Sequence, residues 1–192
     1  MPDEPPSAIE SFIRALPDPS GARSFLERLE AVRPIDQIRD QLLLSRLLTV
    51  AAYSPFLAET ILRHPEYVDW LQREAERGLD RGKTAEQLSE DLARFVTRAI
   101  DGDVRTRLAR FKRRELLRIY LRDCLAIATL SEVTEELSNL ADVILGYALK
   151  LAYQEMVNLH GAPQIRDERR RIESAELAVV ALGKLGCREL NY

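Results

Sequence analysis

The sequence is poor in features that would assign it to several common classes of protein. It has only two cysteines, Cys124 and Cys187, and their separation matches neither a zinc site nor a disulfide framework. No apolar run approaches the roughly 18 residues that a transmembrane helix needs. The 28 basic and 31 acidic residues are mixed along the chain, so no broad basic field is available to hold a nucleic acid. We therefore expect a cytoplasmic protein with no nucleic-acid or membrane partner.

Glycine is also scarce, and its distribution indicates the fold class. Only eight glycines occur, and two of them, Gly183 and Gly186, lie in the last ten residues. Most of the chain therefore lacks the turns of a sheet protein. Residues 1–7 are acidic and proline-rich, unlike an export signal. The composition predicts a mainly α-helical protein.

Apolar residues recur at helical spacing along most of the chain. Three capping boxes, Ser7 with Glu10, Thr84 with Gln87, and Thr129 with Glu132, mark predicted helix starts. Ser54 followed by Pro55 marks another, because serine caps well and proline is tolerated at the first helical position. The predicted helices are residues 7–16, 22–32, 35–53, 54–64, 66–77, 84 to the break at 101–103, 104–128 and 129–159.

The pattern changes after residue 160. Residues 161–176 are mostly polar and predict a linker. The run Leu177-Ala178-Val179-Val180-Ala181-Leu182 is short, apolar and followed by glycine, which is typical of a buried strand that leads into a loop. We therefore predict a helical domain over 1–160, a polar linker over 161–176 and the start of a second domain over 177–192.

The loop after this predicted strand is Gly183-Lys184-Leu185-Gly186. Such a loop lets the backbone approach a phosphate, with a lysine near the charge and a helix N-terminus following. Spacing alone favours a simple tight turn over a phosphate site.

The longer string around this loop is more specific. Residues 181–192 read A-L-G-K-L-G-C-R-E-L-N-Y, which resembles the G-K-L-G-G-R-E-L-N-Y motif of the glutamine synthetase adenylyltransferase family. The resemblance extends to upstream segments and so covers nearly the whole chain. These segments are S-P-F-L-A (54–58), R-H-P-E (63–66), F-K-R-R-E-L-L-R-I (111–119) and L-S-N-L-A-D (137–142).

The resemblance implies a fold and an activity. It implies that the helical bundle leads into the first strand and loop of a polymerase-beta-type nucleotidyltransferase domain. In that family, removal of AMP from a tyrosine of glutamine synthetase is balanced by ATP-dependent adenylylation, with PII as the signal-transducing regulator. The implied nucleotide or phosphate contacts are Gly183, Lys184, Gly186 and Arg188. The implied cofactors of the full-length enzyme are Mg²⁺ and ATP or ADP, and we expect none of them to be tightly bound by residues 1–192.

The family motif continues into a Ser-Ser-Asp-x-Asp element whose aspartates hold magnesium, and the sequence ends before it. We therefore expect residues 1–192 to resemble the beginning of the adenylyl-removing half and to be inactive alone, with no catalytic or metal residue of their own. The alternative is a non-catalytic helical module that docks glutamine synthetase or a regulatory protein. Cys187 replaces a family glycine, and we expect a tolerated small residue rather than a nucleophile unless the position needs a positive φ.

Three other groups of residues have two interpretations each. His64 and His160 end predicted helices, where the helix dipole favours them, and we prefer that interpretation to a base or ligand. The basic run comprising Arg110, Lys112, Arg113, Arg114, Arg118 and Arg122 is either a solvated helix face, which we favour, or a contact for an acidic partner or phosphates. Residues 166–171 are interpreted as a charged linker, with a partner contact as the alternative.

Overall fold

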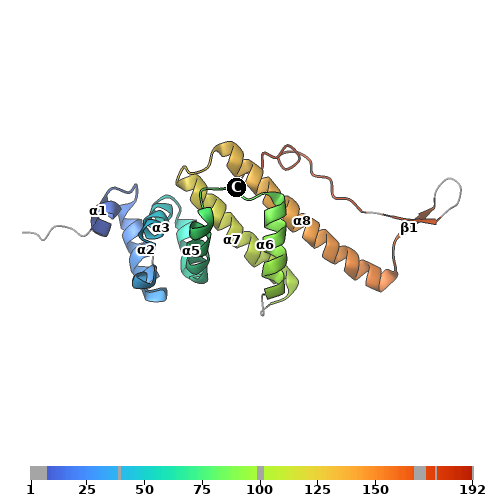
Figure 1. Ribbon diagram of the computed structural model, residues 1–192, viewed down its shortest axis with the longest axis horizontal. Helices are drawn as coiled ribbons and strands as arrows, with labels where there is room; N and C mark the ends of the chain where they lie inside the picture. Colours follow the sequence, from blue (N-terminus) through green and yellow to red (C-terminus); the bar gives the residue numbers. More distant parts are fainter. Residues whose placement is uncertain (1–7, 39, 99–101, 167–171, 176, 192) are drawn as a thin grey trace, which may run out of the picture. The chain divides into compact units, whose positions relative to one another are not determined.

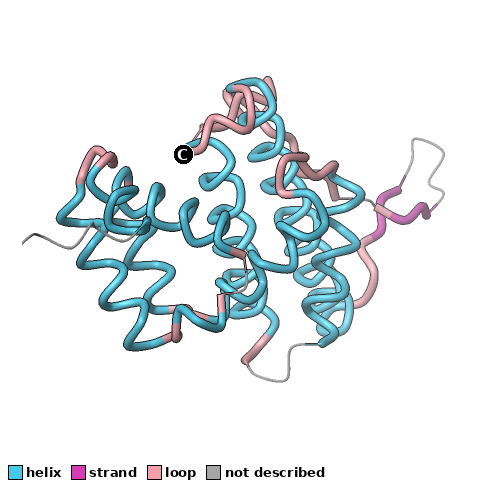
Figure 2. Tube along the Cα trace, turned by 60° about the vertical axis from the view of Figure 1, so that its left-hand side comes forward, coloured by secondary structure: helices cyan, strands magenta, loops and turns pink. Residues whose placement is uncertain are grey.

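The computed structural model describes residues 8–38, 40–98, 102–166, 172–175 and 177–191. In this part of the chain, helices account for most of the trace (Figure 2). Their bounds are α1 Ala8–Arg14, α2 Pro19–Val32, the 3-10 helix η1 Ile35–Gln37, α3 Gln41–Tyr53, α4 Pro55–Arg63, α5 Glu66–Gly78, α6 Ala85–Arg98, α7 Val104–Cys124 and α8 Leu130–His160. The mainly α-helical fold class is confirmed. No helix in these ranges combines the length and apolar character needed to cross a bilayer.

Two compact units make up the chain, and each consists of two segments. The first unit contains Met1–Gly82 and Arg113–Val133, and the second contains Lys83–Lys112 and Thr134–Tyr192. Helices α7 and α8 each contribute residues to both units.

The first unit is built on neighbouring helices that follow one another along the chain (Figure 1). Helix α2 packs against α3 and α4, and α3 also contacts α1 and α5. The apolar faces of these helices form one core, to which α7 adds Leu117 and Leu121. Phe25, Leu29 and Leu47 are at most 3% exposed and no buried core member exceeds 9%, as the helical apolar periodicity predicts.

The local signals for helix starts are mostly confirmed. Leu57 N donates to Ser54 Oγ at 3.3 Å and Pro55 begins α4. Thr84 and Gln87 exchange both hydrogen bonds of a capping box, and so do Thr129 and Glu132. The predicted box at Ser7 lies outside the described residues.

The predicted helix over 35–53 is wrong in its first third. The chain forms the short η1 and then starts again at α3. Asp40 causes this restart, because its carboxylate accepts from Leu42 N at 2.9 Å and so caps α3. The apolar stripe that begins at Ile38 continues across the break, which explains why periodicity alone predicted one helix.

The second unit contains a smaller core and the only strands of the described chain. Leu88, Leu92 and Val96 of α6 are buried, and the rings of Phe95 and Phe111 lie 5.7 Å apart in a tilted arrangement. After α8, strand β1 (Gln164–Arg166) pairs in antiparallel register with β2 (Ile172–Ser174). This exposed strand pair lies within the segment predicted to be a polar linker.

The predicted buried strand over 177–182 is wrong for the chain as described. These residues form no strand, and Leu177, Val179, Val180 and Leu182 are 59–85% exposed. An apolar strand is stable only when neighbouring strands satisfy its backbone and cover its faces, and the described residues supply neither.

Candidate functional site

Residues 183–188 form a single compact turn in the second unit. Cys187 N donates to Gly183 O at 3.0 Å, as in one turn of a helix. Gly183 begins the turn with a φ of +66°, in the left-handed region where glycine is favoured. We call residues 183–188 the GKLG turn.

Arg188 closes the GKLG turn. Glu189 N donates to Lys184 O at 2.8 Å and Arg188 N donates to Leu185 O at 3.1 Å, the pair of bonds that ends a helix in a Schellman motif. Arg188 occupies the left-handed position of that motif, with a φ of +58°. The predicted helix after the loop is therefore wrong up to residue 191, because the chain leaves the turn at this point.

Positions 186 and 187, where the family motif has two consecutive glycines, have different requirements. A Cβ on Gly186 would lie 2.6 Å from Ala181 O, a backbone atom, so any other residue here would force the backbone to shift. Cys187 has no positive φ; that conformation falls on Arg188 instead. Backbone conformation therefore does not require glycine at position 187, and the exposed Cys187 is compatible with the turn.

Lys184 is exposed on the GKLG turn. Its Nζ donates to Asn191 Oδ1 at 3.1 Å, a contact between two exposed side chains. Such a contact is easily exchanged for water or a ligand, because exposed polar pairs contribute little net free energy. The ammonium group is thus available to an anion at this surface.

The GKLG turn is attached to α8 through Arg188 and Leu190. The Arg188 guanidinium donates to Asn139 Oδ1 and lies 3.5 Å from Asp142 Oδ2, while Leu190 N donates to Ser138 Oγ at 3.4 Å. Figure 1 shows the chain turning back along α8 after β1. Two of the segments that carried the sequence resemblance, residues 137–142 and the described part of 181–192, therefore meet in space, a contact that no local pattern predicted.

The structure brings the four predicted site residues together in one turn. Gly183, Lys184 and Gly186 have their backbone at the surface, whereas the Arg188 side chain points to α8. Phosphate binding by these residues stays a prediction.

The basic run of α7 is only in part the solvated surface that we favoured. Arg110, Lys112 and Arg113 are exposed, but Arg118 and Arg122 are at most 1% exposed. Arg118 Nε donates to Glu115 Oε2 at 2.9 Å, and Arg122 donates to Asp80 O at 3.3 Å. Long arginine side chains can pack their stems against apolar neighbours while acidic and carbonyl oxygens accept hydrogen bonds from their heads, so charge alone did not predict exposure.

The two histidines lie at helix ends, as predicted. His64 follows α4, and its Nε2 accepts from Arg113 at 2.8 Å, since arginine can only donate. Its ring also stacks on Tyr67, with centroids 5.1 Å apart. His160 is the exposed last residue of α8. These contacts hold His64 in place at the junction between α4 and α5.

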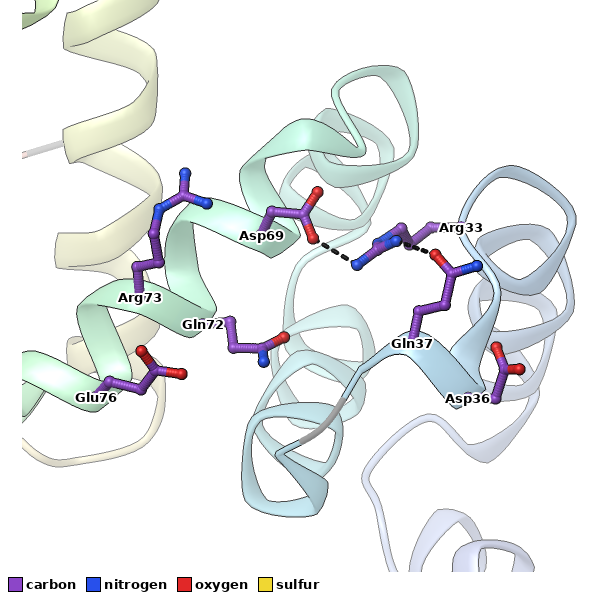
Figure 3. Close-up of a pocket in the computed structure, with 7 residues that line it drawn as sticks. All are labelled: Arg33, Asp36, Gln37, Asp69, Gln72, Arg73 and Glu76. Carbon is purple, nitrogen blue, oxygen red and sulfur yellow. Dashed lines mark hydrogen bonds and ion pairs between the residues drawn. The ribbon is translucent and has the colours of Figure 1, made fainter.

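A polar cleft of about 550 Å³ lies in the first unit, between the end of α2 with η1 and one face of α5 (Figure 3). Its lining contains only charged and amide side chains: Arg33, Asp36, Gln37, Asp69, Gln72, Arg73 and Glu76. Arg33 donates to Asp69 across the cleft and to Gln37 on its own side. Three carboxylates and two guanidiniums nearly balance in charge, so the cleft selects no ligand of one sign.

The described residues contain no group of three or more histidine, cysteine, aspartate or glutamate side chains placed to hold a metal ion. Cys124 and Cys187 are free thiols.

Comparisons with known proteins agree with the motif. Residues 44–192 match the family model of glutamate-ammonia ligase adenylyltransferase. Three relatives carry the name bifunctional glutamine synthetase adenylyltransferase/adenylyl-removing enzyme. The protein from Acinetobacter baylyi is 32% identical over 151 residues, covering 78% of this chain and 16% of the relative. The protein from Nitrosococcus oceani is 34% identical over 153 residues, covering 78% and 15%. The protein from Pseudomonas aeruginosa is 32% identical over 151 residues, covering 78% and 15%.

The chain thus spans about 15% of the length of these curated relatives. No solved structure matches the chain. Since the family model covers more than half of the sequence and includes the GKLG turn, the chain belongs to the glutamate-ammonia ligase adenylyltransferase family.

Proposed function

We propose that this chain is part of an enzyme that removes AMP from, and adds it to, a tyrosine of glutamine synthetase. Family membership supports the reaction class, and the relatives' shared name supports both directions. The observation that carries the proposal is the GKLG turn, in which an exposed lysine stands between two glycines whose backbone geometry is constrained. In the removal reaction, a phosphate oxygen forms a bond to the phosphorus of AMP. The bond to the tyrosyl oxygen breaks, that oxygen takes up a proton, and ADP leaves.

The GKLG turn contributes a contact to the nucleotide phosphates in this proposal. The first N–H groups of a helical turn have no partner within the turn, so those of Lys184 to Gly186 are suited to phosphate oxygens. Gly183 leaves the approach open, because a Cβ added there meets no atom within 4 Å. Lys184 adds a positive charge at the same place. Arg188 belongs to the site by closing the turn.

The same proposal also concerns the segment 177–182, for which the sequence predicted a strand. The exposed apolar side chains of this segment require cover, and a polymerase-beta-type sheet would supply it on both faces. We propose that the segment becomes a strand when the remainder of such a domain is present, with the polar residues 161–176 separating it from the helices that end at 160.

Magnesium and ATP or ADP are proposed as cofactors of the longer enzyme. The described residues of this chain do not fit a magnesium site, because no cluster of carboxylates is assembled among them. No step of the reaction is therefore assigned to a metal ligand of this chain. Glutamine synthetase is the proposed protein substrate and a PII signal protein the proposed regulator.

The proposal is tested by assaying release of ADP from adenylylated glutamine synthetase and phosphate. A longer protein that carries this sequence followed by the remainder of a family-type domain is expected to release ADP. Residues 1–192 alone are expected to release none. If the longer protein binds glutamine synthetase, but neither it nor residues 1–192 alone releases ADP, the chain is a non-catalytic docking module instead. Magnesium-dependent release by residues 1–192 alone would contradict the proposed division of the site.

A further inference from the structure

Arg188 has a backbone conformation that needs support from its surroundings. Among the described residues, only Arg188 and Ala126 combine a side chain with a positive φ. A left-handed φ brings the Cβ of an L-residue close to its own backbone, so this conformation persists where neighbouring contacts hold it. At the corresponding position of a Schellman motif, glycine is the usual residue. The contacts that hold Arg188 therefore determine whether the turn closes.

These contacts come from three residues on one stretch of α8. Asn139 accepts from the Arg188 guanidinium, and Asp142 lies one helical turn further along on the same face. Ser138 accepts from Leu190 N, two residues after Arg188. Ser138 is fully buried and Asn139 is only 7% exposed, so both acceptors have fixed positions. Asp142 is about half exposed and its contact is longer, which makes Asn139 the firmer anchor.

Closure of the turn fixes the backbone of Lys184. The backbone N–H of Glu189, the residue after Arg188, donates to Lys184 O at 2.8 Å. If the Arg188 side chain moves away from Asn139, the left-handed φ of Arg188 loses its support. The hydrogen bond from Glu189 N to Lys184 O then opens as well. The orientation of the Lys184 side chain and N–H is thus coupled to a side chain on α8.

We propose that Asn139 is a positioning residue, which holds Lys184 in place for nucleotide phosphates by anchoring Arg188. The proposal rests on the proposed function of the GKLG turn and adds a specific role for the L-S-N-L-A-D segment of α8. Asn139 itself contacts no phosphate. Its effect reaches the ligand through the closure of the turn.

The test compares four forms of residues 1–192: wild type, Asn139→Leu, Asn139→Asp and Lys184→Ala. Leucine fills a similar volume without an acceptor, whereas aspartate keeps an oxygen where Asn139 Oδ1 lies. Amide hydrogen exchange of Glu189 reports closure of the turn, and titration with ADP reports binding. Circular dichroism and thermal unfolding establish that each form is folded.

We expect Asn139→Leu to speed exchange at Glu189 and to weaken ADP binding by about tenfold, the effect of losing one charge-assisted hydrogen bond. Asn139→Asp should retain wild-type exchange and binding, at an unchanged unfolding midpoint. Lys184→Ala should lose ADP binding while Glu189 stays protected.

Two outcomes overturn the positioning role: ADP affinity that is equal in wild type and Asn139→Leu, or Glu189 exchange that is equal in both. Failure of the proposed function has a different signature. ADP binding that is indifferent to Lys184→Ala contradicts the phosphate contact, whatever the Asn139 variants do. A wild-type chain that binds no ADP does the same, and exchange at Glu189 then still decides whether Asn139 closes the turn.

Discussion

Arg118 and Glu115 form an ion pair that is almost entirely removed from solvent. The two side chains are 1% and 0% exposed, and Arg118 Nε lies 2.9 Å from Glu115 Oε2. Glu115 also accepts from Arg114, whose guanidinium lies over the Trp70 ring at 4.5 Å from its centroid. Arg118 and Arg122, the C-terminal part of the basic run on α7, therefore belong to the interior of the first unit.

Glu115→Gln should destabilise the first unit strongly. The substitution removes the carboxylate and leaves the buried Arg118 charge without it, which costs about 3–5 kcal/mol in comparable buried pairs. Urea unfolding measures this loss. The matched control is Glu59→Gln, which breaks two exposed pairs, with Arg63 on α4 and with Arg28 on α2. The control should leave the urea midpoint almost unchanged, and equal effects of the two variants would show that Glu115 is not buried with its partners.

Asp91 should make stability depend on pH in the acidic range. Burial raises the pKa of this carboxyl, but hydrogen bonds from Lys83 and Arg94 outweigh that effect, and the pKa lies below its ordinary 3.8. A carboxyl with a lower pKa in the folded state stabilises the protein above the ordinary pKa, and the contribution disappears as the pH falls through the folded value.

The measurement compares the free energy of unfolding of wild type and Asp91→Asn at neutral pH and well below pH 3.8. The variant should be less stable at neutral pH and should approach wild type in acid. A difference that stays constant with pH would contradict the assigned interactions.

Deleting residues 173–192 should barely alter the cooperative unfolding of the helices. Apolar side chains between 177 and 182 are exposed, and the tail is attached to α8 through Arg188 and Leu190. Thermal unfolding of residues 1–172 measures this. A collapsed or broadened transition would show that the tail is integral to the helical core.

Cys187→Gly should change stability only slightly. Since position 187 has no positive φ, glycine gains nothing from its conformational freedom and costs roughly 0.5–1 kcal/mol through the entropy of the unfolded chain. Thermal unfolding and the ADP titration measure the result. A variant that is more stable, or that binds ADP more tightly, would mean that the family glycine meets a requirement of the turn.

Local sequence signals predicted the helices well because they act within a few residues. Ser54, Thr84 and Thr129 each satisfy backbone groups at most three residues away, so their roles could be inferred from spacing. Asp40 acts over an equally short distance, but the apolar stripe around it gave the stronger signal. For the same reason Gly183, Lys184 and Gly186 could be placed in one loop from the sequence, whereas the closure of the turn at Arg188 was not predicted.

The remaining features depend on distant partners. Arg122 is buried because Asp80, 42 residues away in the sequence, offers its carbonyl, and Arg188 meets Asn139 across 49 residues. The apolar run at 177–182 has the composition of a strand, but a strand also needs neighbours, and composition does not reveal whether these are present.

Lys184→Ala in the longer, active enzyme tests the central claim most directly. Phosphate-dependent release of ADP from adenylylated glutamine synthetase is measured together with binding of glutamine synthetase, and Lys150→Ala on the exposed surface of α8 serves as the control. We expect Lys184→Ala to lower kcat/KM by about tenfold or more, since a charged contact to phosphate is lost, while the control and the binding stay at wild-type values. Unchanged kinetics in Lys184→Ala would contradict a phosphate contact at the GKLG turn.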